Sequence, residues 1–300
     1  MSSRPAPLAA DISARSKATL LVLAAMVLFA AYDALAKHLA ATYPVTELLW
    51  VRYATHAGLM LLVFGPTMGL RLVKTAQPVA QVLRALLLVA VTFLFMSGLK
   101  HIRLAEATAI NFLAPLLVTA LSAPLLKETV PLRSWIAVSV GFVGVLLIVR
   151  PGAEMNAAML FPLGSAVCYS LYQVMTRRFV GAEHPVTTHF ILGSVGLVAT
   201  TFTWQASWSM PTPAHLPLML GLGLTTGTGH FLLIKAFEHI SPAAAAPFTY
   251  THLVWAVVLG FVAFGEVPAL LSVLGILTIA GSGLFNALGA RANAGPPTRR

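Results

Sequence analysis

The stretch TFLFMSGLKHIRLAEA at residues 92–107 returns in altered form as HFLLIKAFEHISPAAA at residues 230–245. At this offset of 138 residues, 8 of the 37 positions that end at Glu128 and Glu266 are identical. Self-similarity at a fixed offset indicates an internal duplication. The sequence therefore predicts two related halves, each of which ends its matched segment with a glutamate.

The composition is that of an integral membrane protein. Of the 300 residues, 58% are hydrophobic and only 9% are charged, whereas about 25% of the residues of a soluble domain are charged. Apolar runs of about 20 residues, long enough to cross a bilayer as a helix, recur along the chain. The only cysteine, Cys168, cannot form an intrachain disulfide, and no Cys/His cluster suggests a metal site. We expect no metal and no cofactor.

Turn residues divide the apolar sequence into ten predicted transmembrane helices, five in each half. The first half is predicted at 18–150 and the second at 158–288, with cytoplasmic tails at 1–17 and 289–300. The predicted spans are 18–41, 46–66, 80–99, 103–126, 132–150, 158–178, 187–205, 216–237, 241–264 and 268–288.

The odd number of spans in each half decides how the halves are related. A second copy of a five-helix unit must enter the membrane upside down relative to the first. Transporters use such inverted repeats to form one site near mid-depth that opens alternately to either side. The predicted fold class is all-α, with two inverted five-helix repeats around a central cavity. A duplication without functional meaning is the alternative.

The distribution of Lys and Arg predicts the orientation. With the N-terminus in the cytoplasm, 14 of the 19 Lys and Arg residues, Arg84 included, fall on the inner side. Both termini are then cytoplasmic in a multi-pass protein of the inner membrane. The net charge of +10 reflects this topology, and its spread over many loops argues against a nucleic-acid partner. The polar N-terminal segment lacks the apolar region of a secretory signal.

Several segments carry a resemblance to a known family. They are YDALAKHL (32–39), TELLWVRY (46–53), AEATAINFLAPLLVTALSAPLLKE (105–128) and the segment from FLLIKAFEH to FVAFGE (231–266). With the terminal glutamate of each repeat, they resemble the EamA-type transporters of the drug/metabolite transporter superfamily. The resemblance implies metabolite transport across the cytoplasmic membrane and does not fix the substrate.

Charged residues inside the first two spans are candidates for function, because such residues are costly in a membrane. Asp33 and Lys37 are spaced i, i+4 and can form a structural pair on one helix face. Alternatively, Asp33 faces the cavity and accepts a proton or a substrate amino group. Arg52 needs an anionic or carbonyl partner, for which Glu47 and Asp33 are candidates, or else it binds a substrate carboxylate.

Proline and polar residues in the fourth and ninth spans predict kinked walls of the binding site. Asn111 lies near Pro115, and the repeat alignment places Asn111 over Thr249 and Phe112 over Tyr250. Packing alone is the competing explanation for these kinks. The full set of predicted substrate-binding residues is Tyr32, Asp33, Arg52, Phe93, Met96, Asn111, Tyr172, Gln173, His230, Thr249, Tyr250 and Trp255.

This predicted set is aromatic and polar with few net charges, and it suits a small amphipathic solute. We expect a secondary transporter, an exporter of apolar or aromatic amino acids. The alternative is import or export of a larger heterocyclic metabolite, riboflavin-like or adenosyl-methionine-like. An integral membrane enzyme is a remote alternative, since no nucleophile motif, metal motif or P-loop is present. Protons are an open candidate for a coupling ion, and we expect a monomer or a weak homodimer.

Overall fold

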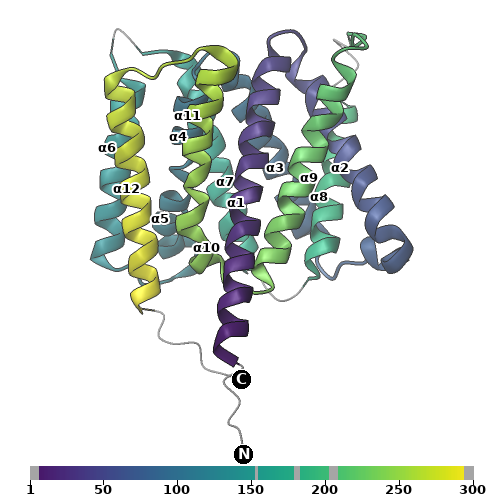
Figure 1. Ribbon diagram of the computed structural model, residues 1–300, viewed down its shortest axis with the longest axis horizontal. Helices are drawn as coiled ribbons and strands as arrows, with labels where there is room; N and C mark the ends of the chain where they lie inside the picture. The colour runs from purple at the N-terminus through teal and green to yellow at the C-terminus, as the bar shows by residue number, and fades with distance from the viewer. Residues whose placement is uncertain (1–6, 153–154, 179–182, 203–208, 294–300) are drawn as a thin grey trace, which may run out of the picture.

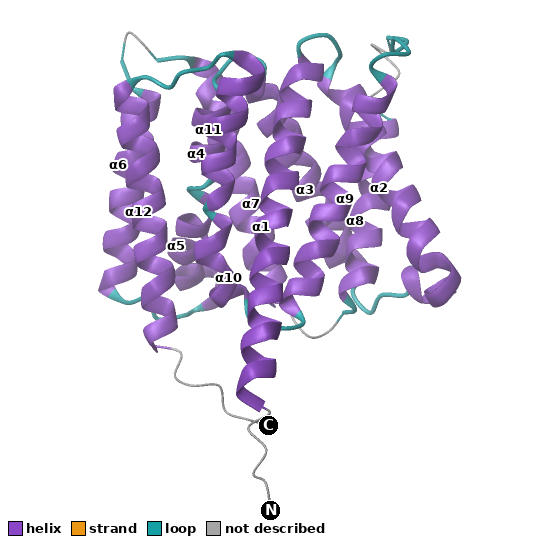
Figure 2. Ribbon diagram, in the orientation of Figure 1, coloured by secondary structure: helices purple, strands orange, loops and turns teal. Residues whose placement is uncertain are grey.

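The computed structural model describes residues 7–152, 155–178, 183–202 and 209–293, and every regular element in them is helical (Figures 1 and 2). Short 3₁₀ turns occupy Gly69–Leu72 and Ala157–Met159. The α-helices are α1 (Pro7–Ala40), α2 (Val45–Met68), α3 (Pro78–Leu99), α4 (Leu104–Asn111), α5 (Ala114–Leu126), α6 (Leu132–Val149), α7 (Leu160–Arg178), α8 (Pro185–Thr201), α9 (Leu216–Phe237), α10 (Pro242–Thr249), α11 (Thr251–Phe264) and α12 (Leu270–Asn293).

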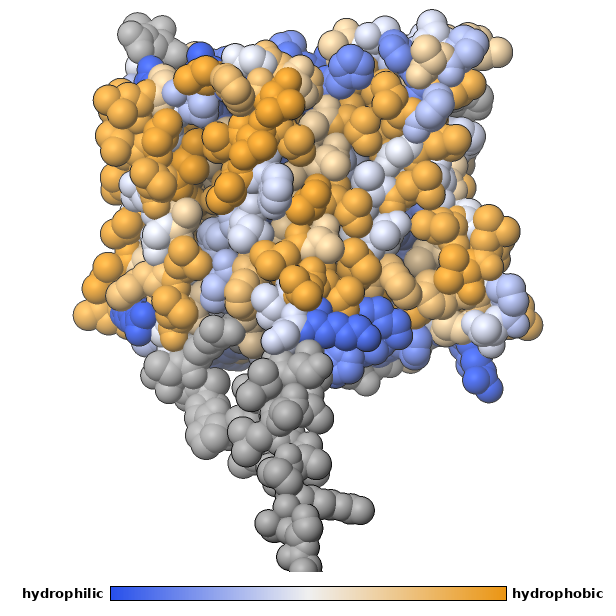
Figure 3. Space-filling view, viewed as in Figure 1, coloured by the Kyte–Doolittle hydropathy of each residue, from blue (hydrophilic) through white to orange (hydrophobic). Residues whose placement is uncertain are grey.

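These helices give the ten predicted spans, with α4–α5 and α10–α11 each forming one interrupted span. Nine of the described spans are long and apolar enough to cross a membrane; α8, with 17 described residues, is the tenth. The first helix begins at Pro7, eleven positions before the predicted start. A band of apolar residues covers the middle of the molecule, and hydrophilic residues gather toward its two ends (Figure 3). The protein is therefore a multi-pass membrane protein.

Helices α6 and α12 show that the second repeat is inverted. They are the fifth spans of the two repeats, so they would run parallel if both repeats had the same orientation. They run antiparallel instead: Gly144 packs against Ile279, whereas Arg133, earlier on α6, reaches the backbone carbonyl of Phe285, later on α12. The start of α1 and the end of α12 lie at the same end of the molecule (Figure 1). We call this the termini end and the opposite one the far end.

The contacts between the repeats are also symmetric. In the second repeat, α7, α8 and α9 correspond to α1, α2 and α3 of the first. The contact of α1 with α9 therefore corresponds to that of α7 with α3, and the contact of α2 with α9 to that of α8 with α3; all four pairs pack together. The contact of α1 with α11 corresponds in the same way to that of α7 with α5. The pairs α2 with α8 and α6 with α12 each join two corresponding helices. One packing arrangement therefore occurs twice, once toward each end of the molecule, as a carrier with two equivalent gates requires.

The crossing of α6 and α12 depends on two glycines. A Cβ added to Gly275 would lie 2.6 Å from the backbone oxygen of Gly144, and one added to Gly144 would lie 2.9 Å from the backbone oxygen of Gly275. The helices thus touch backbone to backbone, which is the close approach that small residues permit in membranes.

We predict that Gly275→Ala lowers the stability of the purified protein. The added methyl group has a backbone atom in its way, and overpacking of this kind costs about 1–3 kcal/mol. Gly281→Ala on the same helix is the matched control, because its Cβ would meet nothing within 4 Å. Thermal unfolding in detergent measures both; equal midpoints for the two variants would contradict the proposed crossing.

Candidate functional site

Polar residues of α1, α2 and α3, the first three spans of the first repeat, converge inside the bundle. We call this group the central cluster and define it as Tyr32, Asp33, Arg52, Tyr53, Thr92 and Met96. Each of these residues is at most 7% exposed. The Tyr32 hydroxyl donates to Sδ of Met96 over 3.5 Å, and the Tyr53 hydroxyl lies 3.4 Å from Oγ1 of Thr92. The cluster is closely packed, so a solute can enter only when the helices part.

Asp33 connects the first repeat to the second. Its Oδ2 atom lies 2.9 Å from Nε2 of His252 on α11, and both side chains are largely buried. The predicted alternative of an Asp33–Lys37 pair on one helix face is wrong, because Lys37 bonds elsewhere. An i, i+4 pair contributes only about 0.2–0.5 kcal/mol. Asp33 instead pairs with His252 on α11, and Lys37 pairs with Glu266 in the loop after α11.

Arg52 is held by aromatic rings. Its guanidinium carbon lies 4.6 Å from the ring centroid of Tyr53 and 5.2 Å from that of Tyr32. One terminal nitrogen reaches the hydroxyl of Thr92 at 3.5 Å, and the buried Nε atom has no hydrogen-bond partner. Among the described residues no carboxylate forms an ion pair with Arg52. A buried guanidinium in this state is a suitable ligand for an anionic group.

Glu47, a predicted partner of Arg52, has a different role. Its Oε2 atom accepts hydrogen bonds from the backbone nitrogen and the hydroxyl of Ser209, each over 3.1 Å. The carboxylate therefore ties the beginning of α2 to the segment before α9. The expectation of a Glu47–Arg52 pair is wrong.

Both interrupted spans break at the same place in their repeat. Phe112 directly follows the end of α4, and Tyr250 directly follows the end of α10; the loop between α4 and α5 is visible in Figure 2. The rings of Phe112 and Tyr250 lie 5.1 Å apart between centroids. The nearby prolines are not equivalent, since Pro115 follows one break and Pro247 precedes the other. The interruption of the fourth span is thus a property of the repeat.

A second polar group lies on α3 and α7. The guanidinium carbon of Arg84 lies 5.4 Å from the ring centroid of Tyr172, and its NH1 atom donates to Gln81 over 3.3 Å. Tyr169 stacks on Tyr172, and Gln173 donates to the hydroxyl of Tyr169. Arg84 is only 5% exposed, so its side chain packs inside the bundle. Its position about one turn inside the predicted span 80–99 was the signal available in the sequence.

The other predicted residues lie at varying distances from the central cluster. Asn111 contacts the hydroxyl of Ser165 at 3.0 Å, and the hydroxyl of Thr249 bonds the backbone oxygen of Ala246. Phe93 and Trp255 are 40% and 37% exposed and share the outward stripes of α3 and α11 with other exposed apolar residues. The structure therefore places these two apart from the central cluster, on surfaces suited to lipid.

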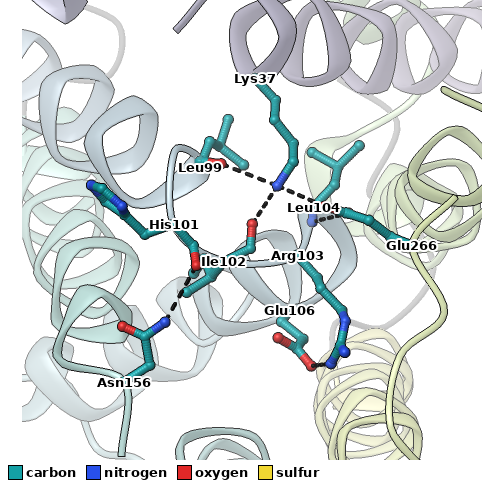
Figure 4. A network of polar contacts seen from close by, with 9 residues as sticks. All are labelled: Lys37, Leu99, His101, Ile102, Arg103, Leu104, Glu106, Asn156 and Glu266. Carbon is teal, nitrogen blue, oxygen red and sulfur yellow. Dashed lines mark hydrogen bonds and ion pairs between the residues drawn. The ribbon is translucent and has the colours of Figure 1, made fainter. Parts of the chain in front are cut away.

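The far end is closed by a network around Lys37 (Figure 4). The ammonium of Lys37 donates to the backbone oxygens of Leu99 and Ile102 and forms a 2.8 Å ion pair with Glu266. Glu266 also accepts from the backbone nitrogen of Leu104 over 2.7 Å, at the beginning of α4. The ends of α1, α3, α4 and α11 are thus joined. A shallow pocket of about 550 Å³ lies beside this network, outside the central cluster.

We predict that Lys37→Met opens the far end. The change removes three interactions at once and leaves the Glu266 carboxylate without its cation. A single reporter cysteine at Ile102, in a Cys168→Ser background, is expected to react faster with a membrane-impermeant maleimide when Lys37 is Met. Lys235→Met, which breaks an exposed ion pair with Glu238 at the other end of the molecule, is the control. Unchanged labelling in Lys37→Met would show that this network does not close the far end.

Comparison with known proteins agrees with this arrangement. The model of the EamA-like transporter family matches the chain twice, at residues 16–150 and 156–287. The chain belongs to the EamA-like transporter family. A solved crystal structure superimposes with a TM-score of 0.64 at 23% identity, covering 91% of this chain and 98% of that one, which shows the shared fold.

The curated relatives of this EamA-family chain carry different small molecules. It is 29% identical over 264 residues to an S-adenosylmethionine uptake transporter of Rickettsia bellii, covering 88% of this chain and 90% of that protein. A riboflavin transporter of Vibrio cholerae is 29% identical, covering 75% and 76%. A pseudopaline exporter of Pseudomonas aeruginosa is 28% identical, covering 85% and 90%. The protein is accordingly a membrane transporter and not an enzyme.

Proposed function

We propose that this chain carries a zwitterionic heterocyclic metabolite, with the size and charge pattern of S-adenosylmethionine, across the cytoplasmic membrane by alternating access. Asp33 offers an anion for the positively charged part of such a solute, and Arg52 offers a cation for its carboxylate. Tyr32 and Tyr53, which face Arg52, supply aromatic surface. The observation that carries the proposal is this juxtaposition of a carboxylate and an unpaired guanidinium in one buried cluster.

The relatives favour this proposal over amino-acid export. The four S-adenosylmethionine uptake transporters among them are 26–29% identical to this chain, and the riboflavin and pseudopaline proteins also carry solutes larger than an amino acid. An amino acid would satisfy Asp33 and Arg52 equally well but would leave the aromatic surface partly empty. We therefore place amino-acid export second and uptake of the heterocyclic solute first.

The proposed orientation places the termini end in the cytoplasm. Without the buried Arg84, the sequence still assigns 13 of the 19 Lys and Arg residues to the inner side, and the bias persists. The network around Lys37 then faces the outside. In this orientation the structure corresponds to a carrier whose outer gate is shut.

Uptake by proteoliposomes tests the proposed function. The purified chain is reconstituted without ATP, and labelled S-adenosylmethionine, riboflavin, phenylalanine and leucine are supplied separately. We expect saturable uptake of S-adenosylmethionine that unlabelled phenylalanine does not inhibit at tenfold excess. Saturable uptake of phenylalanine alone would replace the proposal with amino-acid transport, and no uptake of any of the four would overturn the substrate class.

A further inference from the structure

Three histidines from three helices meet inside the bundle next to Arg52. We call them the histidine cluster and define it as His56 on α2, His189 on α8 and His230 on α9. The ring centroid of His230 lies 5.1 Å from that of His189 and 6.4 Å from that of His56. His56 is 8% exposed, and the other two rings are partly exposed. Of the three, only His230 was predicted from the sequence as a site residue, and the structure brings His56 and His189 beside it.

The backbone brings the three rings together. Glycines on α8 and α9 allow α2 to approach closely, because a Cβ on Gly193 would lie 2.7 Å from the His56 ring and one on Gly223 would lie 2.8 Å from the backbone oxygen of Arg52. His230 is further fixed by Phe29, whose ring centroid lies 5.0 Å away. The rings are therefore held in place by packing.

Hydrogen bonds leave the cluster with free acceptors. Nδ1 of His230 lies 2.8 Å from the backbone oxygen of Thr226. A carbonyl oxygen only accepts, so Nδ1 carries the hydrogen and Nε2 of the neutral ring keeps its lone pair. Neutral His56 and His189 rings likewise each keep one nitrogen with a lone pair. Within the membrane the cluster thus offers nitrogen atoms that can each take up a proton, and mutual repulsion of imidazolium charges favours one added proton at a time.

Arg52 connects this proton site to the substrate site. It precedes His56 by one helical turn on the same face of α2, and its charge acts on both His56 and His230. An unpaired guanidinium opposes protonation of the cluster, whereas a guanidinium neutralised by a carboxylate does not. The charged groups that face the cluster are Arg52 on α2 and Arg84 on α3. Arg52 itself lies against Tyr32 and Tyr53, and His252 on α11 lies 6.4 Å from the ring of Phe29, which also contacts His230.

We propose that the histidine cluster binds the coupling ion, a proton, which enters together with the carboxylate of the substrate at Arg52. This inference rests on the proposed transport function and adds its energy source. A carboxylate on Arg52 makes protonation of the cluster favourable, and by reciprocity a protonated cluster strengthens binding of the carboxylate. Substrate and proton therefore cross together, and an inward proton gradient drives accumulation.

The wild-type protein gives the first test. Proteoliposomes loaded with a pH-sensitive dye and diluted into S-adenosylmethionine should acidify inside as substrate enters, with about one proton per substrate. In a separate binding experiment, detergent-solubilised protein should take up a proton when it binds the substrate. Substrate affinity should then rise up to about tenfold for each unit of falling pH. Substrate entry without any proton movement, or proton release on binding, would overturn the proposal even though transport itself stands.

Variants locate the proton. His56→Asn and His189→Asn are each expected to lower the acidification and the accumulation driven by a pH gradient more than they lower exchange of labelled for unlabelled substrate at equal pH. His239→Asn, at the exposed end of α9, is the matched control and should retain both. Full gradient-driven accumulation in a folded His189→Asn protein, together with full accumulation in His56→Asn, would remove the cluster from coupling. If the proposed function fails, exchange fails in wild type as well, which separates the two outcomes.

Discussion

Asp33→Asn is expected to reduce substrate affinity about 10- to 100-fold while leaving the protein folded. The amide keeps an oxygen that can accept from Nε2 of His252, 2.9 Å away in the structure, but it has no charge for the positive group of a substrate. A charge-assisted hydrogen bond contributes about 1.5–3 kcal/mol, and each 1.4 kcal/mol is tenfold in affinity. Binding of labelled S-adenosylmethionine in detergent, with thermal unfolding measured in parallel, gives both quantities.

The matched control for Asp33 is Glu238→Gln, which removes a half-exposed carboxylate at the end of α9. Its affinity should equal that of wild type. Asp33→Ala is expected to be unstable, because it leaves His252 without its partner inside the membrane. If Asp33→Asn binds and transports like wild type while Asp33→Ala unfolds, Asp33 is a structural link between α1 and α11 and no substrate ligand.

Arg52→Gln is expected to remove recognition of the substrate carboxylate. Wild type should bind decarboxylated S-adenosylmethionine at least about tenfold more weakly than S-adenosylmethionine, because a charge-assisted bond to the guanidinium is lost. In Arg52→Gln the two compounds should bind equally weakly. Arg52→Lys keeps the charge but lacks the planar fork stacked between Tyr32 and Tyr53, so an intermediate affinity is expected.

Arg71→Gln, an exposed guanidinium in the loop after α2, is the control for the loss of charge and should preserve discrimination between the two compounds. The comparison uses two ligands on one protein, and a general loss of stability would weaken both by the same factor. Undiminished discrimination in Arg52→Gln would therefore place the carboxylate elsewhere, with Arg84 as the next buried guanidinium to examine.

The fold could be predicted from the sequence because the membrane leaves few choices. Backbone groups in lipid must bond within their own helix, so each apolar run of sufficient length became a span. The odd number of spans in each repeat then forced the inversion that α6 and α12 display. Helix starts were less predictable: α1 begins at Pro7 because a helix can extend beyond the apolar segment that anchors it.

Pairing of charges could not be predicted from the sequence in the same way. Spacing along one helix suggested Asp33 with Lys37, but the partners come from α11 and from the loop after it. Whether two residues more than 200 positions apart meet depends on helix rotation and approach, which small residues on neighbouring helices determine. The histidine cluster illustrates this, since Gly193 and Gly223 let α8 and α9 approach α2 closely, without any pattern in the polar residues themselves.

Burial of Arg84 has the same explanation. In the sequence, Arg84 lies near the end of a span and is counted as a charge at the membrane surface. In the structure its guanidinium packs against Gln81 and Tyr172 inside the bundle. Long basic side chains near helix ends usually extend to the membrane surface. Here a hydrogen-bonding neighbour one turn away and an aromatic ring on α7 retain the guanidinium inside, and both features depend on the packing of α3 against α7.

Counterflow tests the central claim, a single site that faces the two sides of the membrane alternately. Proteoliposomes preloaded with unlabelled S-adenosylmethionine at equal pH on both sides are diluted into a trace of labelled substrate. A transient accumulation of label above its outside concentration is expected. Each outward crossing with unlabelled substrate returns the site to the outside, where it binds label, while the excess unlabelled substrate inside competes with the label for exit. Label that only equilibrates, at a rate independent of the preloaded substrate, would contradict alternating access and indicate a pore.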